Sequence, residues 1–297
     1  MTGTRPDALL RHDLELPDAE FRAIAQLMHR QTGVLLDDGS RPLVFSRLAR
    51  HVRRLGKSSF ADYLAYLAGP NGAGERERMI DALTTNTTRF FREPAHFELL
   101  RAQVMPDLRR KAEAGARVRL WSAACSSGEE AYSIAAAVHA AFPDAARHDL
   151  RILATDVNRQ MLDRAQDATY PAEIAGDVPD AYRDALFEPA AKGAALVVRR
   201  ALRDLVSVRY LNLMDPWPVS GAFDVIFCRN MAIYLDAATQ ARLWARLAGV
   251  LAPRGALFIG HSERLGAERE HAFETLGHTA FRLRGAPAGE TRGAPCR

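Results

Sequence analysis

The sequence predicts an α/β protein, with a doubly wound, mostly parallel sheet that is preceded by a small all-helical domain. Three observations lead to this fold class. From Ala116 onward, short apolar runs typical of strands alternate with longer segments of helical periodicity. The earlier part of the chain shows helical periodicity alone. Between the two parts lies the glycine-rich stretch "GPNGAGERE" (residues 69–77), the best candidate for a domain boundary.

The overall composition is that of an ordinary globular protein. The 297 residues are 48% hydrophobic and 26% charged, and the net charge of +4 is too small to indicate a nucleic-acid partner. The three cysteines show no C-x-x-C spacing, so neither a disulfide framework nor a metal site is predicted. The N-terminus lacks the apolar core of a signal peptide, and no apolar run reaches about 18 residues. We therefore expect a cytoplasmic protein without membrane insertion.

The helical part is expected to form one domain over residues 18–78, after a tail of residues 1–17. Its second predicted helix, residues 41–56, has an apolar stripe and a separate basic face. This helix contains five arginines and no acid, whereas a generic surface helix mixes both signs of charge. The basic face is either merely solvated or a docking surface for an anionic partner. It consists of Arg47, Arg50 and Arg54.

The second part is expected to comprise a linker, residues 79–115, and a sheet domain, residues 116–284. The alternation of strands and helices breaks within this domain, where a small antiparallel β-subdomain is predicted at about residues 171–204. The tail 285–297 is expected to be disordered. The predicted strands are residues 117–122, 151–156, 205–213, 223–230, 255–260 and 279–283, and the predicted helices are residues 128–142, 158–166 and 236–251.

The turn after the first predicted strand, "AACSSGEE", contains one glycine, Gly128. A dinucleotide site would need G-x-G-x-x-G there, so that the backbone could approach a pyrophosphate. The acids that follow, Glu129 and Glu130, would repel phosphates and attract an ammonium group. The alternative is that they only start a helix, because acids favour the first helical turn.

Polar residues also follow two later strands. Asp156 ends the second strand, where a carboxylate accepts hydrogen bonds from ribose hydroxyls. It could instead cap the next helix, a role also open to Asn158. Arg229 and Asn230 follow the strand "FDVIF", and packing explains this pair poorly. Together these groups predict a site for a nucleoside with a cationic, phosphate-free tail, which is S-adenosylmethionine rather than NAD or ATP.

Six segments carry a family resemblance: "LTTNTTRFFRE", "WSAACSSGEEAYSIA", "ATDVNRQMLDRA", "VRYLNL", "FDVIFCRNMAIYLD" and "GALFIGHSE". In this order they resemble the CheR family of chemotaxis protein-glutamate O-methyltransferases, from about Phe21 to Leu283. The resemblance implies a class I methyltransferase fold, which is Rossmann-like with an antiparallel C-terminal strand. It also implies methyl transfer from S-adenosylmethionine to glutamate carboxylates of chemoreceptors (methyl-accepting chemotaxis proteins), leaving S-adenosylhomocysteine and using no metal.

In the family, the stretch "LTTNTTRFFRE" (residues 83–93) links the helical and catalytic domains and closes over the cofactor. The resemblance implies that Arg92 orients the incoming carboxylate and that Tyr234 donates a hydrogen bond near it. It places Glu129 at the amino end of the cofactor and Asp156 at the ribose. The full set of cofactor-binding residues that it implies is Asn86, Thr88, Arg92, Glu129, Asp156, Asn212, Leu213, Arg229 and Asn230.

The partner that the resemblance implies is the cytoplasmic coiled coil of a chemoreceptor. This rod carries exposed glutamates, so its charge is complementary to the basic face of residues 41–56. The inserted segment "EPAAKGAA" lacks the Gly-x-Gly loop of family members that hold a receptor's C-terminal pentapeptide. The sequence therefore argues against a pentapeptide tether.

Two other classes of function stay open. A non-catalytic adapter would bind S-adenosylmethionine or receptors without turnover. A DNA methyltransferase that modifies amino groups usually carries [DNS]-P-P-[YF] after its fourth strand, and "CRNMAIY" has no prolines. We therefore disfavour a nucleic-acid substrate. In "GHSER", His261 and Glu263 are expected to satisfy the end of the fifth strand, since the segment does not match G-x-S-x-G.

Overall fold

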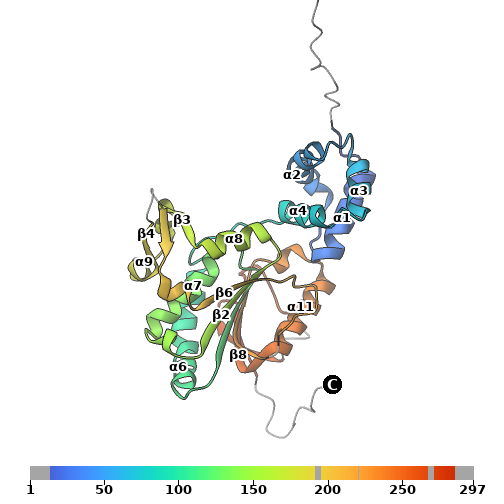
Figure 1. Cartoon of the computed structure of the whole chain (residues 1–297). Coiled ribbons are helices and arrows are strands. Elements are labelled where there is room, and N and C mark those ends of the chain that lie inside the picture. The colour runs from blue at the N-terminus through green and yellow to red at the C-terminus, as the bar shows by residue number, and fades with distance from the viewer. Residues whose placement is uncertain (1–13, 191–194, 220, 267–270, 285–297) are drawn as a thin grey trace, which may run out of the picture. The chain divides into compact units, whose positions relative to one another are not determined.

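The computed structural model describes residues 14–190, 195–219, 221–266 and 271–284. The chain divides into two units, Met1–Thr84 and Thr85–Arg297 (Figure 1). The first unit is helical, and the second contains a seven-stranded sheet and a separate three-stranded sheet. The predicted fold class is therefore confirmed.

Helices form the whole regular structure described for the first unit. The first helix ends at Gly33, whose φ of 73° gives the left-handed C-cap that glycine adopts without strain. The sequence favours Asp18 as the N-cap of this helix, because aspartate is a preferred cap, but Pro17 takes that position, so this prediction is wrong. The elements are α1 (Asp18–Thr32), the 3-10 turn η1 (Asp38–Ser40), α2 (Arg41–Arg54), α3 (Phe60–Ala68) and α4 (Ala73–Leu83). Their shared core includes Phe21, Ile24, Met28, Val44, Leu48, Val52, Phe60, Tyr63 and Leu67.

The unit boundary lies later in the chain than the sequence predicts. Helix α4 begins inside the glycine-rich stretch and continues past residue 78, the expected end of the helical domain. Met79 and Leu83 of α4 are buried, so apolar burial keeps this helix in the first unit. The expected linker up to residue 115 is also largely helical. It contains α5 (Pro94–Leu99), the π-helix η2 (Leu100–Val104) and α6 (Met105–Glu113).

Two arginines of the predicted docking face are bonded within their own unit. Arg54 donates to Glu75, an acid of α4 that is 1% exposed, with a distance of 2.5 Å between Nη2 and Oε2. Glu75 also bonds His51 Nδ1 at 2.8 Å. Burial by itself raises the pKa of the Glu75 carboxyl, but the hydrogen bonds from Arg54 and His51 outweigh it, and the pKa is lowered. Arg47 donates to the backbone carbonyls of Ala82 and Thr84.

The large sheet of the second unit has the strand order β6-β2-β1-β7-β8-β10-β9. The five strands β6, β2, β1, β7 and β8 are parallel to one another. Strand β10 is antiparallel to β8, and β9 is antiparallel to β10. From β1 the chain proceeds to β2 and β6 on one side and later to β7 and β8 on the other, so the order reverses between β1 and β7. The strands are β1 (Val118–Ala123), β2 (Leu150–Asp156), β6 (Val206–Tyr210), β7 (Phe223–Cys228), β8 (Leu251–Ile259), β9 (Phe273–Gly277) and β10 (Ala280–Leu283).

Helices cover both faces of this sheet (Figure 1). Neighbouring residues of β1 point to opposite faces, because side chains alternate along a strand. Leu120 joins the core that contains Ile134 of α7, whereas Trp121 joins the core that contains Trp244 of α11. The main helices are α7 (Glu129–Ala141), α8 (Arg159–Asp167) and α11 (Ala237–Val250), with short 3-10 turns η3 (Ala145–Arg147) and η5 (Ala232–Tyr234).

Strand β9 was not predicted. It forms a hairpin with β10 through His278 and Thr279, whose φ values are 46° and 58°. Two successive positive φ values are typical of a hairpin turn that usually reveals itself as Asn-Gly. The sequence "GHTA" contains no such signal, and only the pairing with β10 makes "FETLG" a strand.

The inserted subdomain has three antiparallel strands in the order β3-β5-β4, where a hairpin unit was predicted. The loop between β4 and β5, on which the argument against a pentapeptide tether rests, includes residues 191–194 outside the described ranges. The predicted tail 285–297 also lies outside them. The elements are β3 (Thr169–Pro171), η4 (Ala172–Asp177), α9 (Asp180–Leu186), β4 (Phe187–Pro189), β5 (Ala195–Val198) and α10 (Arg200–Arg203). Within the described ranges, no helix has the length and apolarity of a membrane span.

Candidate functional site

The candidate site lies at the carboxyl ends of the parallel strands, around the point where the strand order reverses. The loops after β1 and β7 flank this point, which is where open α/β sheets bind ligands. Both loops contain non-glycine residues in the left-handed region: Ala124 at φ 66°, Ser126 at φ 50° and Asn230 at φ 57°. Such conformations cost energy and gather at functional sites.

The loop after β1 brings a carboxylate into a desolvated position. Gly128 has a φ of 98°, and a Cβ there would lie 2.9 Å from the Tyr170 hydroxyl, so any other residue would be strained at this position. Glu129 is the first residue of α7 and is 6% exposed. Burial raises the pKa of its carboxyl, although the Ser127 hydroxyl donates to it at 2.8 Å. A buried carboxylate with one hydrogen-bond donor is well suited to an ammonium group.

Asp156 connects the end of β2 to the loop after β1. Its Oδ2 accepts a hydrogen bond from the Ser126 N–H at 2.8 Å, and its Oδ1 accepts from the Asn158 N–H at 2.8 Å. Asn158 is the residue that caps α8, because its side chain accepts from the Met161 N–H. Asp156 is therefore not the cap of this helix, and its carboxylate lies beside the loop that carries Glu129.

Residues 85–92 lie against this same loop. The Ser126 hydroxyl donates to the Asn86 carbonyl at 3.0 Å, and Arg92 Nη1 donates to the Thr87 carbonyl at 3.0 Å. Thr88 is half-buried. The two phenylalanines of the segment hold it to the domain.

The Phe90 ring packs edge-on against Tyr170 and Phe187, with centroids 5.0 and 5.1 Å away. Phe91 stacks on Tyr182 with a centroid distance of 4.5 Å. The unusual composition of "TTNTTRFFRE" therefore combines a polar half with an apolar anchor.

The guanidinium of Arg229 makes its hydrogen bonds to groups of the protein itself. Its side chain is 2% exposed, and its Nε pairs with Glu130 Oε2 at 2.8 Å. Its Nη1 donates to the Arg92 carbonyl at 2.7 Å and to His96 Nδ1 at 3.1 Å. Glu130, which was considered as a ligand-facing acid, accepts from the Ser122 hydroxyl on its other oxygen. The predicted cofactor contact of Arg229 is therefore assigned to its backbone, because its side chain is 2% exposed and its Nε and Nη1 bond protein groups.

His96 supports this arrangement as a neutral ring. Burial, and to a smaller extent the charge of Arg229, lower its pKa to about 4, against the hydrogen bond to the His278 carbonyl. The neutral ring accepts at Nδ1 from Arg229 and donates from Nε2 to the His278 carbonyl at 2.8 Å. The histidine is thus a structural partner and not a base near the site.

Glu263 holds the loop after β7. It is 4% exposed, and its carboxylate accepts from the backbone N–H groups of Gly260, Asn230 and Ala232. The sequence-based expectation for Glu263 is therefore confirmed, whereas the His261 side chain is 71% exposed and bonds Glu93. Asn230 Nδ2 also donates to Glu93, at 3.3 Å.

Tyr234 lies in η5, directly after the loop that Glu263 holds, and its side chain is half-buried. Two further predicted cofactor residues follow β6. Asn212 is 8% exposed and accepts the Met214 N–H on Oδ1 at 3.0 Å. The carbonyl of Leu213 accepts from Trp217 Nε1 and Arg246 Nη1.

Hydrogen bonds thus bring together most of the predicted site within the second unit. They connect the segment of Asn86 and Arg92 to Asp156 through Ser126, and to Asn230 through Glu93. Arg47, Arg50 and Arg54 belong to the other unit. Sequence reasoning gave no role to Ser126, Ser133, Glu93 or His96, because each is recognisable only by a partner distant in the chain.

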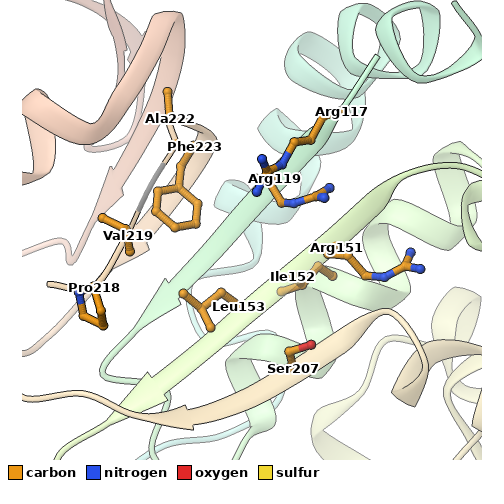
Figure 2. Close-up of a pocket in the computed structure, with 11 residues that line it drawn as sticks. Arg117, Arg119, Arg151, Ile152, Leu153, Ser207, Pro218, Val219, Ala222 and Phe223 are labelled. Carbon is orange, nitrogen blue, oxygen red and sulfur yellow. The ribbon is translucent and has the colours of Figure 1, made fainter. Parts of the chain in front are cut away.

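A separate cavity of about 320 Å³ lies at the opposite, amino ends of β1 and β2 (Figure 2). Figure 2 shows Arg117, Arg119 and Arg151 around an apolar surface that includes Leu153 and Phe223. Arg119 pairs with Asp149 at 2.6 Å. This cavity contains none of the predicted site residues. Over the described ranges, no group of three or more His, Cys, Asp or Glu side chains could hold a metal ion.

Known proteins resemble both units of the chain. The family described as "CheR methyltransferase, SAM binding domain" matches residues 86–282, and "CheR methyltransferase, all-alpha domain" matches residues 19–84. A "Probable chemotaxis protein methyltransferase" from Rhizobium etli is 44% identical over 258 residues, which cover 86% of this chain and 96% of that protein. The "Chemotaxis protein methyltransferase" of Escherichia coli is 37% identical over 273 residues, covering 91% of this chain and 92% of its own length. Because both units match in order and nearly from end to end, the chain belongs to the CheR methyltransferase family.

Proposed function

We propose that this protein transfers the methyl group of S-adenosylmethionine to glutamate side chains of chemoreceptors, in the cytoplasm, forming glutamate methyl esters. The observation that carries the proposal is the pair of bonds made by Ser126. Its N–H bonds Asp156 and its hydroxyl bonds the Asn86 carbonyl. This residue therefore joins the proposed ribose carboxylate to the segment that bears Arg92. The names of the relatives support the link to chemotaxis.

The donor groups suit this cofactor. Glu129 offers a buried carboxylate to the amino end of the methionine moiety, and Asp156 offers another to the ribose hydroxyls. The turn between β1 and α7 has a single glycine and two acids, which disfavours a pyrophosphate. Asn212 and Leu213 after β6, and the backbone of Arg229 and Asn230 after β7, would complete the site. When bound, S-adenosylmethionine supplies a methyl group on a positively charged sulfonium.

The reaction requires alignment more than acid–base catalysis. A glutamate carboxylate has an ordinary pKa of about 4.3, so the nucleophile is already ionised near neutral pH. One carboxylate oxygen forms the new C–O bond as the S–CH₃ bond breaks, and S-adenosylhomocysteine leaves. Opposite charges are neutralised, so exclusion of water and correct positioning contribute most. We assign this positioning to Arg92, with Tyr234 donating a hydrogen bond nearby.

The test of this function is transfer of tritiated methyl from S-adenosylmethionine to membranes that contain chemoreceptors. Label that is released by mild base is expected, because glutamate methyl esters hydrolyse readily. Base-stable label would indicate methylation of another group and overturn the ester assignment. Binding of the cofactor without any transfer would instead support a non-catalytic adapter.

The affinity for S-adenosylmethionine is expected to fall as the pH drops. Binding of an ammonium group favours the ionised form of Glu129, and burial raises the pKa of this carboxyl. Affinity is therefore full above the raised pKa and is lost as the pH falls through it. Calorimetric titration of the cofactor over the acidic and neutral range measures this. Glu129→Gln should bind weakly and flatten the pH dependence, whereas Glu113→Gln, which removes an exposed acid, should leave it unchanged.

We further propose that the basic face of α2 binds the anionic receptor rod, with Arg50 as its centre and Arg53 beside it. Both side chains are exposed, and neither makes a hydrogen bond or an ion pair with the part of the chain that the structure describes. Arg47 and Arg54, the other two members of the predicted face, bond groups of their own unit. A change of Arg54 to Glu would bring a second negative charge beside the buried Glu75 and destabilise this unit.

The docking test is therefore the pair Arg50→Glu and Arg53→Glu. Receptor methylation should fall at least about tenfold at low salt, because several exposed pairs of about 0.2–1 kcal/mol each are reversed in sign. The affinity for S-adenosylmethionine should stay unchanged. Arg147→Glu with Arg200→Glu alters net charge equally on the second unit and serves as the control. Unchanged methylation by the α2 variant would remove this face from the mechanism.

A further inference from the structure

The backbone on both sides of Arg92 has unfavourable torsion angles. Phe91 has a φ of 49° and Glu93 a φ of 59°, both in the left-handed region. A bulky aromatic residue rarely adopts this conformation, and each such residue costs energy that surrounding contacts must offset. The groups that hold the backbone of Phe91 and Glu93 in this conformation therefore help to determine the position of the Arg92 Cα.

The peptide group between Phe90 and Phe91, one before the peptide that joins Phe91 to Arg92, is held by Ser133 of α7. The Phe91 N–H donates to Ser133 Oγ at 2.9 Å, and this hydroxyl donates to the Glu129 carbonyl at 2.7 Å. Ser133 is fully buried, so the Phe91 N–H has no access to water as a substitute partner. One serine thus links the Arg92 segment to the helix that begins with Glu129.

The peptide after Arg92 is held by Arg229. Its Nη1 donates to the Arg92 carbonyl at 2.7 Å, while its Nε pairs with Glu130 at 2.8 Å. Glu130 is fixed in turn by the Ser122 hydroxyl at 2.7 Å. The guanidinium carbon of Arg229 lies 5.4 Å from the centre of the Phe97 ring. A buried, charged and fully packed arginine offers a rigid donor to a single carbonyl.

We propose that Ser133 and Arg229 are positioning residues, which fix Arg92 by holding the N–H of the preceding residue, Phe91, and the carbonyl of Arg92 itself. They touch neither the cofactor nor the receptor glutamate through their side chains. They act through Arg92, because these two bonds, together with the bond from the Arg92 N–H to the Arg89 carbonyl at 3.4 Å, restrict the position of its Cα. Packing of the Phe90 and Phe91 rings holds the segment to the domain but leaves the peptide orientations undetermined. This inference rests on the proposed role of Arg92 in orienting the carboxylate.

The test is a double-mutant cycle between Ser133→Ala and Arg92→Ala, with kcat and calorimetric cofactor affinity as readouts. Ser133→Ala alone should lower kcat about tenfold or more and change the affinity for S-adenosylmethionine by less than about threefold. In the Arg92→Ala background the same change should lower kcat less than about twofold, because the side chain that it positions is already gone. Ser133→Thr retains the hydroxyl and should restore most of kcat.

The variant Arg229→Lys tests the role of Arg229 independently of Ser133. Lysine keeps a positive charge for Glu130 but cannot present two donors in a fixed plane, so the bond to the Arg92 carbonyl should be lost. Its effect on kcat should likewise vanish in the Arg92→Ala background.

Equal slowing of the wild-type and Arg92→Ala enzymes by Ser133→Ala would overturn the inference, as would equal losses in kcat and cofactor affinity. Full kcat in the Arg92→Ala variant would instead refute the proposed role of Arg92 itself. The two failures are therefore distinguishable.

Discussion

Replacement of Arg92 with alanine is expected to lower kcat for receptor methylation by about 10²–10³-fold, the range typical of losing one preorganised charged donor. The loss should exceed any loss in affinity for S-adenosylmethionine, because the guanidinium is assigned to the incoming carboxylate. Arg92→Lys should recover only part of the activity, since lysine cannot reproduce the planar fork that binds a carboxylate through two parallel bonds. Steady-state kinetics with receptor membranes and calorimetry with the cofactor give the two quantities.

Arg89 provides the matched control for this experiment. It is an exposed arginine of the same segment, three residues before Arg92. Arg89→Ala removes an equal charge without removing the bond to the Thr87 carbonyl, which belongs to Arg92. We expect nearly unchanged kcat. Equal losses of turnover and cofactor affinity in Arg92→Ala would make Arg92 a cofactor ligand and not an orienting group.

Replacement of Asp156 with alanine is expected to weaken S-adenosylmethionine binding by about 2–4 kcal/mol, or about 30- to 1,000-fold in Kd. The reason is the loss of charge-assisted hydrogen bonds to the ribose hydroxyls. Isothermal calorimetry measures the change directly. Unchanged affinity in a folded Asp156→Ala protein would remove Asp156 from the cofactor site.

A second variant separates this role from the structural bonds of Asp156. The carboxylate also accepts from the N–H groups of Ser126 and Asn158, and alanine leaves both without their acceptor. Asp156→Asn keeps one acceptor oxygen and should therefore lose less thermal stability than the alanine variant. Its affinity should still be reduced, because the negative charge is gone. Asp163→Ala, which removes an exposed acid of α8, should alter neither quantity.

Local patterns were sufficient for most of the fold. Apolar periodicity predicted the strands that became β1, β2, β7 and β10, and the stop at Gly33 was recognisable from glycine alone. The boundary after α4 and the strand β9 were not predictable in this way. Both are stabilised by contacts with other elements, which periodicity within one segment does not report.

Some features of the candidate site could likewise be predicted from local sequence patterns, and others could not. A carboxylate at the end of the strand "RILATD" and acids after a one-glycine turn are local features, and they indicated the cofactor class without any coordinates. The family resemblance added the roles of Arg92, Tyr234, Asn212 and Leu213. The partner of each charged side chain could not be predicted from the sequence, because adjacent residues point in different directions once a helix forms. Glu129 stays by the site, whereas its neighbour Glu130 turns to Arg229.

The sequence by itself therefore determined the α/β architecture and the helical unit before it, and it predicted a phosphate-averse site with Asp156 and Glu129. Only the tertiary structure decided which basic residues are available to a ligand or partner. Arg229 pairs with Glu130, 99 residues away in the chain, and Arg54 pairs with the buried Glu75. The physical reason is that a charge leaves water only when a partner compensates for the lost hydration, and that partner is chosen by the packing of distant elements.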